Sequence, residues 1–141
     1  MNWLFWALLS AFFAGLTAIF AKVGVSGVDS NLATAIRTSV VVIFSWALVA
    51  ALSKGKSLHL HDLSRRTWLF LFLSGLATGL SWLCYFRALQ LGQASKVAPI
   101  DKLSVVFVLV FAALYLHEPL SWHQWFGGAI IVAGAIVLAL K

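Results

Sequence analysis

Asp101 and Lys102 stand side by side within an otherwise apolar stretch of the sequence, and Arg37 lies inside another such stretch. Ionisable residues are costly in an apolar environment, so they mark sites of ion pairing, solute binding or proton exchange. Arg37, with Lys102, is the candidate to contact a negative group of a solute. Asp101 is the only acid within an apolar stretch, which makes it the proton-coupling candidate. A structural role is also open, because an acid complements the positive end of a helix that Pro99 begins.

Hydroxyl and aromatic side chains recur at helical spacing through the same stretches. The clearest series consists of Ser74, Thr78, Ser81 with Trp82, and Tyr85. Such faces are expected to point at one another or at water, so they predict a shared cavity. For any single hydroxyl, close packing and a hydrogen bond to its own helix backbone are the simpler interpretation. The candidates for solute binding are Arg37, Thr17, Thr78, Trp82, Tyr85, Asp101, Lys102 and Ser104.

The elements that must position these residues are membrane-spanning helices. Of the 141 residues, 62% are hydrophobic and 10% are charged, whereas soluble domains carry about 25% charged residues. Five apolar stretches come near the roughly 20 residues that a spanning helix needs. They cover 3–21, 31–52, 68–89, 97–116 and 122–140. The apolar runs are unbroken, whereas a membrane β-barrel would show segments of about ten residues with alternating polarity, so the pattern favours helices. The sequence predicts an all-α integral membrane protein, a five-helix bundle that forms a single domain over 1–141.

The last of these stretches begins with a recognisable helix start. Ser121 and Gln124 have the spacing of a capping box, in which the two residues satisfy each other's backbone amides. Pro119 precedes it, where proline ends the previous helix. The rest of the 122–140 stretch is rich in glycine and alanine and has no polar side chain after Gln124. We expect this helix to serve packing, including packing against a second protomer.

The basic residues, which give a formal net charge of +6, are spread over loops and helix ends. They do not form the stripe that nucleic-acid binding requires, so we expect membrane lipids as their partners and no nucleic acid. If the helices alternate in direction, four basic residues lie on one side: Lys54, Lys56, Arg65 and Arg66. The other side holds Lys22, Lys96 and Lys141, with Arg37, Arg87 and Lys102 just inside helices. Because orientation follows this bias, both a dual topology and a single orientation with the N-terminus inside stay open.

No catalytic or metal-binding motif is present. The sequence has no H-E-x-x-H, no G-x-S-x-G and no glycine-rich phosphate loop. Cys84 is the only cysteine, and the His59-x-His61 pair has no third ligand near it in sequence. We therefore expect no catalytic residues, no metal and no cofactor, and we do not expect an enzyme.

The second half of the chain resembles the EamA domain of the drug/metabolite transporter superfamily. The pattern that carries this resemblance comprises Tyr85, Ala88, Leu89, Gly92, Ala94, Ser95, Val97, Pro99, Glu118, Leu120, Gln124, Gly127 and Gly134. Arg37 looks like the arginine that EamA domains often carry early in their second helix. Most members resemble two such five-helix domains fused as inverted repeats, whereas this chain has one copy.

The resemblance implies an EamA-like half-transporter in the bacterial inner membrane, a multi-pass protein that moves a small organic metabolite or drug-like solute. Two copies would rebuild the family's central cavity, so a homodimer is expected, and an antiparallel pair matches the weak charge bias. Alternating access by inverted repeats is the general mechanism of secondary transporters. The alternative is a non-transporting membrane subunit that assembles with a second five-helix protein.

Overall fold

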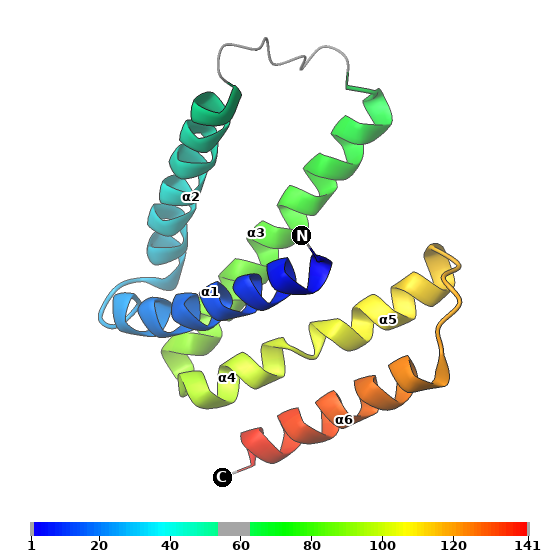
Figure 1. Cartoon of the computed structure of the whole chain (residues 1–141). Helices are drawn as coiled ribbons and strands as arrows, with labels where there is room; N and C mark the ends of the chain where they lie inside the picture. The colour runs from blue at the N-terminus through cyan, green and yellow to red at the C-terminus, as the bar shows by residue number, and fades with distance from the viewer. Residues whose placement is uncertain (1, 54–62, 141) are drawn as a thin grey trace. The chain divides into compact units, whose positions relative to one another are not determined.

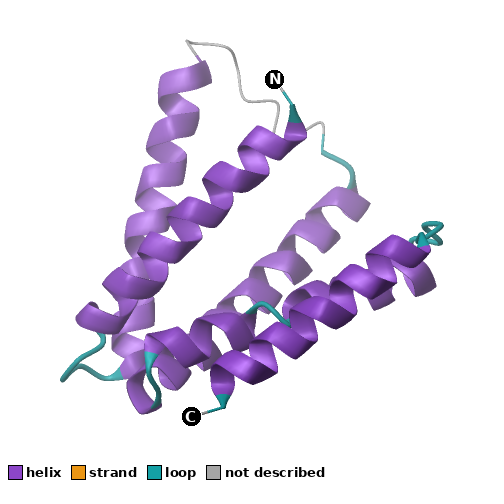
Figure 2. Cartoon of the chain, turned by 60° about the horizontal axis from the view of Figure 1, so that its bottom comes forward, coloured by secondary structure: helices purple, strands orange, loops and turns teal. Residues whose placement is uncertain are grey.

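The computed structural model describes residues 2–53 and 63–140, and the regular structure of these residues is entirely helical (Figure 1, Figure 2). The helices are α1 (Trp3–Gly24), α2 (Ser30–Ser53), α3 (Arg65–Leu91), α4 (Ala94–Asp101), α5 (Ser104–Tyr115) and α6 (Trp122–Ala139). Five segments of this part of the chain are long and apolar enough to cross a membrane, with α4 and α5 together forming one of them. The prediction of an all-α membrane protein with five spans is confirmed.

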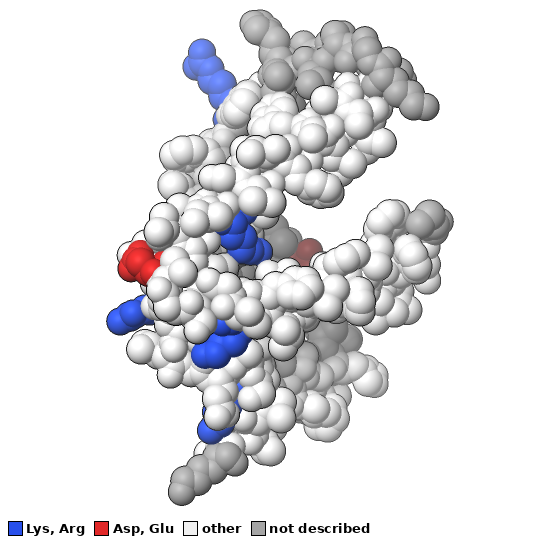
Figure 3. Space-filling view, turned by 90° about the vertical axis from the view of Figure 1, so that its left-hand side faces the viewer, with Lys and Arg blue, Asp and Glu red and all other residues white. Residues whose placement is uncertain are grey.

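Large apolar side chains cover the outside of these helices. Trp3 of α1 is 77% exposed and Ile43 of α2 is 69% exposed, whereas Leu89 is a rare fully buried large side chain. Exposing apolar surface to water costs about 25 cal/mol per Å², so such a surface is suited to lipid. On the face drawn in Figure 3, the charged side chains form isolated patches on an uncharged surface. The exposed surface agrees with five spans in a bilayer.

The chain divides into two compact units. The first unit comprises Met1–Val23 and Ala88–Lys141, and the second comprises Gly24–Arg87. In the first unit, α6 packs along both α4 and α5 (Figure 1). Gly128 of α6 is buried, and a Cβ added there would lie 2.9 Å from Cδ1 of Leu109 on α5. A small residue at this position therefore allows the two helices to approach each other closely.

In the second unit, Asp29 begins α2. Its Oδ1 atom accepts hydrogen bonds from the backbone amides of Asn31 at 2.9 Å and Leu32 at 3.0 Å. The first amides of a helix have no partner within the helix, so this carboxylate satisfies two of them. Gly27, with a φ of 75°, supplies the left-handed backbone of the preceding turn. Gly27 thus turns the chain after α1, and Asp29 caps the start of α2.

The fourth span differs from the predicted helix over 97–116. It begins earlier, at Ala94, because the amides of Lys96 and Val97 both donate to the carbonyl of Gln93 at 3.0 Å. It is also interrupted after Asp101, where four backbone amides between Lys102 and Val106 each donate to the carbonyl three residues back. This tighter pattern is that of a 3₁₀ turn. The prediction that Pro99 begins the helix is wrong, since Pro99 lies within α4.

The start of α6 follows the predicted capping pattern. The backbone amide of Ser121 donates to Oε1 of Gln124 at 2.6 Å, and the Ser121 hydroxyl donates to the same atom at 3.0 Å. Upstream, His117 has a φ of 53°, a left-handed conformation that stops α5 at its C-terminal end. Local sequence signals therefore define the connection between α5 and α6.

Candidate functional site

The side chain of Arg37 lies over aromatic rings within the second unit. Its Cζ atom is 4.0 Å from the ring centroid of Trp82 and 5.6 Å from that of Phe86. Trp82 and Phe86 are one helical turn apart on α3, so both rings face the same neighbour. A guanidinium within about 6 Å of a ring centroid is attracted to the electron-rich face. Arg37 is half-buried, and these rings stabilise its charge in an apolar region.

Tyr85 is the third aromatic residue near this cation. It is half-buried on α3 and lies close enough to Arg37 for the two side chains to influence each other. The predicted binding residues Arg37, Trp82 and Tyr85 are thus brought together in one unit. We call Arg37 with Trp82, Tyr85 and Phe86 the arginine–aromatic cluster. It presents one cationic group and flat apolar surfaces, a combination suited to a small organic anion.

Three threonine hydroxyls of the same unit donate hydrogen bonds to backbone carbonyls of their own helices. Thr34 donates to the Ser30 carbonyl at 2.7 Å, and Thr38 donates to the Thr34 carbonyl at 2.7 Å. Thr78, a predicted binding residue, donates to the Ser74 carbonyl at 2.9 Å and is exposed. Hydroxyl groups in helices often bond to the backbone four residues earlier. Each of these hydroxyls thus makes the backbone hydrogen bond that the simpler interpretation expects, while solute binding by Thr78 and the shared cavity stay predictions.

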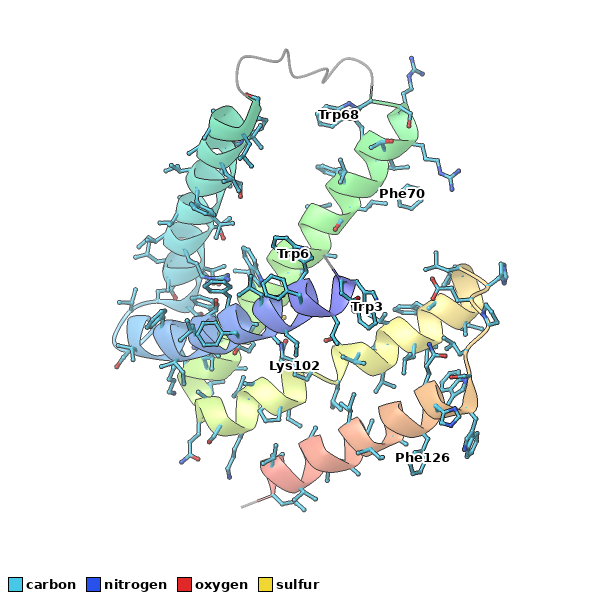
Figure 4. The ribbon with its side chains drawn as sticks, viewed as in Figure 1. Trp3, Trp6, Trp68, Phe70, Lys102 and Phe126 are labelled. Atoms are coloured by element: carbon cyan, nitrogen blue, oxygen red, sulfur yellow. The ribbon has the colours of Figure 1, made fainter. Side chains whose placement is uncertain are left out.

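Asp101 and Lys102 lie in the first unit, at the interruption between α4 and α5. Lys102 is labelled in Figure 4. The Lys102 ammonium is 3.4 Å from Oδ2 of Asp101, and the two side chains are 56% and 36% exposed. An exposed pair of this kind contributes at most about 1 kcal/mol to stability. The structural interpretation required Asp101 to lie in the N-terminal turn of its helix. Asp101 is instead the last residue of α4, so that interpretation is wrong. Its carboxylate remains half-exposed, and its coupling role stays a prediction.

The remaining predicted binding residues also lie in the first unit. Thr17 is half-buried on α1, and Ser104 is the exposed first residue of α5. Arg37 belongs to the second unit and Asp101 to the first. The structure thus places the two aromatic candidates beside Arg37 in the second unit, and Asp101, Lys102 and Ser104 at the α4–α5 interruption in the first.

Lys22 has a role that the sequence did not reveal. Its ammonium group donates hydrogen bonds to the carbonyl of Leu89 and, at 2.7 Å, to the carbonyl of Gly92. These carbonyls lie at and just beyond the C-terminal end of α3, where helix carbonyls lack partners and the helix dipole attracts a cation. The sequence interpretation placed Lys22 among lipid headgroups. The only local feature in the sequence that could have suggested this role is that Lys22 lies in the last turn of its own helix, α1.

An open groove runs between α4 and α6 in the first unit. It has a volume of about 430 Å³ and is lined by apolar atoms almost throughout. Its lining residues are Ala98, Pro99, Lys102, Ile131, Gly134, Ala135 and Leu138. Lys102 therefore borders this groove as well as pairing with Asp101.

No group of three or more metal-ligating side chains occurs among residues 2–53 and 63–140. The His59 and His61 pair lies outside this part of the chain, as do Lys54, Lys56 and Lys141 of the predicted charge pattern. Cys84 is a free, exposed thiol on α3.

Comparison with known proteins gives a family match over nearly the whole chain. The model of the EamA-like transporter family matches residues 1–140. A Sinorhizobium protein, named as an uncharacterized transporter in the cobO 3′ region, is 56% identical over 139 residues, which are 99% of this chain and 97% of that protein. No solved structure matches the chain.

More distant relatives match about half of the chain. A probable 4-amino-4-deoxy-L-arabinose-phosphoundecaprenol flippase subunit, ArnE of Aeromonas hydrophila, is 35% identical over 75 residues, 52% of this chain and 63% of that protein. An uncharacterized transporter of Bacillus subtilis, YvbV, is 34% identical over 71 residues, 50% of this chain and 23% of that protein.

Proposed function

The chain belongs to the EamA-like transporter family, and we propose that it moves a small organic metabolite or drug-like solute across the bacterial inner membrane. It is a multi-pass transporter and not an enzyme, and five candidate spans lie among residues 2–53 and 63–140. In this proposal it works by alternating access as an antiparallel homodimer, because one five-helix domain supplies only half of an inverted pair. The weak Lys/Arg bias between the two sides supports insertion in both orientations.

The observation that carries the proposal is the arginine–aromatic cluster. Arg37 holds its charge over Trp82 at 4.0 Å, within a span where charged residues are expensive. A guanidinium in this position can pair with a carboxylate or phosphate through two parallel hydrogen bonds. The Trp82 and Tyr85 rings add flat apolar surface beside it. These features favour an organic solute that carries at least one negative group.

Asp101 is the proposed proton-coupling residue. Its carboxylate is half-exposed at the interruption between α4 and α5, in a segment that otherwise reads as one span. Interrupted helices near the middle of a span are recurrent sites of ion coupling in secondary transporters. The Lys102 ammonium, 3.4 Å from the Asp101 carboxylate, can pair with it when it is deprotonated and would lose this ion pair when it is protonated.

Solute flux through the purified protein tests transport. Thermal-shift screening of the detergent-solubilised protein against organic acids, amino acids and sugar phosphates would select a ligand, and uptake of the labelled ligand into proteoliposomes would follow. We expect uptake by the wild type and a loss of about tenfold or more in Arg37→Gln, equivalent to about 1.4 kcal/mol. Arg66→Gln is the matched control, because Arg66 also lies beside a ring, Phe70, at 5.8 Å. Equal losses in both variants would contradict a binding role for Arg37.

Accessibility of a C-terminal tag tests the antiparallel homodimer. In right-side-out and inside-out vesicles, dual insertion exposes part of the tag population from each side. Labelling from one side only would exclude the antiparallel arrangement. Molecular mass in detergent, measured by light scattering, separates a homodimer from a monomer.

A second function is a subunit role. The ArnE relatives are named as flippase subunits, which favours assembly with a second five-helix protein. In this alternative, the lipid-linked sugar of those relatives' names would be the class of solute, and the open apolar groove between α4 and α6 would accommodate a hydrocarbon chain. Flux by the purified protein alone argues against the subunit role, whereas flux that appears only after addition of a co-purifying partner argues for it.

A further inference from the structure

Lys22 ties together two distant segments of the first unit. Its ammonium group donates to the carbonyls of Leu89 and Gly92, and the side chain is half-buried rather than extended toward solvent. Leu89 itself is fully buried. An ammonium that carries two hydrogen bonds at a helix C-terminus is held by both the free carbonyls and the helix dipole. We call this arrangement the Lys22 clamp.

The clamp lies at the two places where the chain passes between the units. The chain leaves the first unit after Val23, directly after Lys22, and returns to it at Ala88, directly before Leu89. The two residues of the first unit that join the second unit, Val23 and Ala88, are therefore direct neighbours in sequence of Lys22 and Leu89. The clamp therefore joins the two segments of the first unit next to both attachment points.

The turn that receives the ammonium group is closely packed. The Gly92 amide donates to the Ala88 carbonyl at 2.8 Å. A Cβ added at Gly92 would lie 3.0 Å from Cγ2 of Val97 and 3.3 Å from the Ala88 carbonyl oxygen. This side of the clamp is thus held by backbone hydrogen bonding and by close packing against α4, independently of Lys22.

We propose that the Lys22 clamp is the pivot on which the second unit, Gly24–Arg87, moves during transport. Lys22 is then a positioning residue, since it acts through the backbone of Leu89 and Gly92 and contacts no solute. The proposal rests on the proposed function in one respect, because alternating access requires one part of the protein to rock against another. Hinges in such motions consist of a few residues at the ends of helices, which is where the clamp lies.

Distance measurements by pulsed electron paramagnetic resonance test the pivot without any solute. The native Cys84 supplies one spin label in the second unit, and Ile130→Cys supplies an exposed second label on α6 of the first unit. A separate pair, Cys84 with Ile43→Cys, lies wholly within the second unit. Both pairs are measured in the wild-type background, in Lys22→Met and in Lys22→Arg, after reconstitution into lipid nanodiscs. Because labels of two protomers can interact in a dimer, labelled protein is diluted with an excess of unlabelled protein lacking Cys84.

In Lys22→Met we expect the distribution between units to broaden about twofold, as a hinge does when it loses a tether. The distribution within the second unit should stay unchanged, and Lys22→Arg should restore the wild-type width between units. Lys96→Met is the matched control, because Lys96 is another half-buried lysine of the first unit and takes no part in the clamp.

Three results would overturn the proposal. These are an unchanged distribution between units in Lys22→Met, equal broadening of both pairs, or equal broadening in Lys96→Met. Equal broadening of both pairs would mean that Lys22 supports folding in general. None of these results depends on solute flux, so a failure of the pivot is distinguishable from a failure of the proposed transport function.

Discussion

The guanidinium of Arg37 lies face-on to the indole ring of Trp82, with Cζ 4.0 Å from the ring centroid. This contact joins α2 to α3 within the second unit and explains how a permanently charged side chain is accommodated in a membrane span. The ring stabilises the charge without neutralising it. In the proposed function, this retained charge is what pairs with an anionic solute.

Replacing Trp82 should weaken this arrangement in a graded manner. We expect Trp82→Leu to lose the cation–π contribution, about 0.5–2 kcal/mol, and Trp82→Phe to retain part of it. The measurement is the affinity for the screened anionic ligand, by isothermal titration calorimetry, alongside the thermal unfolding midpoint. Phe70→Leu, beneath Arg66 at 5.8 Å, is the control. Unchanged affinity in Trp82→Leu would show that the ring takes no part in binding.

Asp101→Asn should abolish the response of uptake to a proton gradient. The amide keeps the size of the carboxylate but does not take up or release a proton at physiological pH. Loss of the exposed ion pair with Lys102 costs at most about 1 kcal/mol. We therefore expect nearly wild-type thermal stability and uptake that no longer depends on the gradient. The assay compares proteoliposomes with and without an imposed pH difference. Full gradient-driven uptake in the variant would exclude the coupling role.

Gly128 should tolerate a larger residue far less well than its neighbour Gly127. A Cβ at Gly128 meets Leu109 at 2.9 Å, whereas a Cβ at Gly127 meets nothing within 4 Å. We expect Gly128→Val to destabilise the protein by about 1–3 kcal/mol through overpacking. Gly127→Val carries the same change in helix propensity and serves as the control.

Adding Leu109→Ala to Gly128→Val should recover part of the lost stability, because it removes the side chain that the new residue meets. Thermal unfolding in detergent reports all of these variants. Equal destabilisation by Gly127→Val and Gly128→Val would contradict close packing of α5 against α6 at this position.

Asp29→Ala should destabilise the start of α2. The change removes the oxygen that accepts from the amides of Asn31 and Leu32, and loss of such a cap costs about 0.5–2 kcal/mol. Asp29→Ser keeps an acceptor and should remain close to the wild type. Hydrogen exchange of the Asn31 and Leu32 amides reports the effect directly. Faster exchange in both variants alike would mean that the side-chain oxygen is not the protecting group.

Much of this fold follows from local physical constraints in the sequence. A bilayer of fixed thickness demands apolar runs of about 20 residues, so the number of spans and their approximate positions could be predicted without knowledge of any contact. The Ser121 and Gln124 pair could be predicted for the same reason, since both partners belong to one helix turn. The arginine in the second span and the acid in the fourth were identified as unusual from their apolar surroundings alone.

Other features could not be predicted because they depend on partners far apart in the chain. Lys22 finds its carbonyl partner 67 residues away, at Leu89, and no local pattern distinguishes that contact from a lysine that reaches for lipid headgroups. The choice of Trp82 and Phe86 as the rings beside Arg37 likewise required the packing of two helices. The early start of α4 placed Pro99 inside a helix and Asp101 at its end. The sequence by itself thus determined the membrane-spanning helices, because apolar length is a local property, while the tertiary structure alone decided which charges meet which partners.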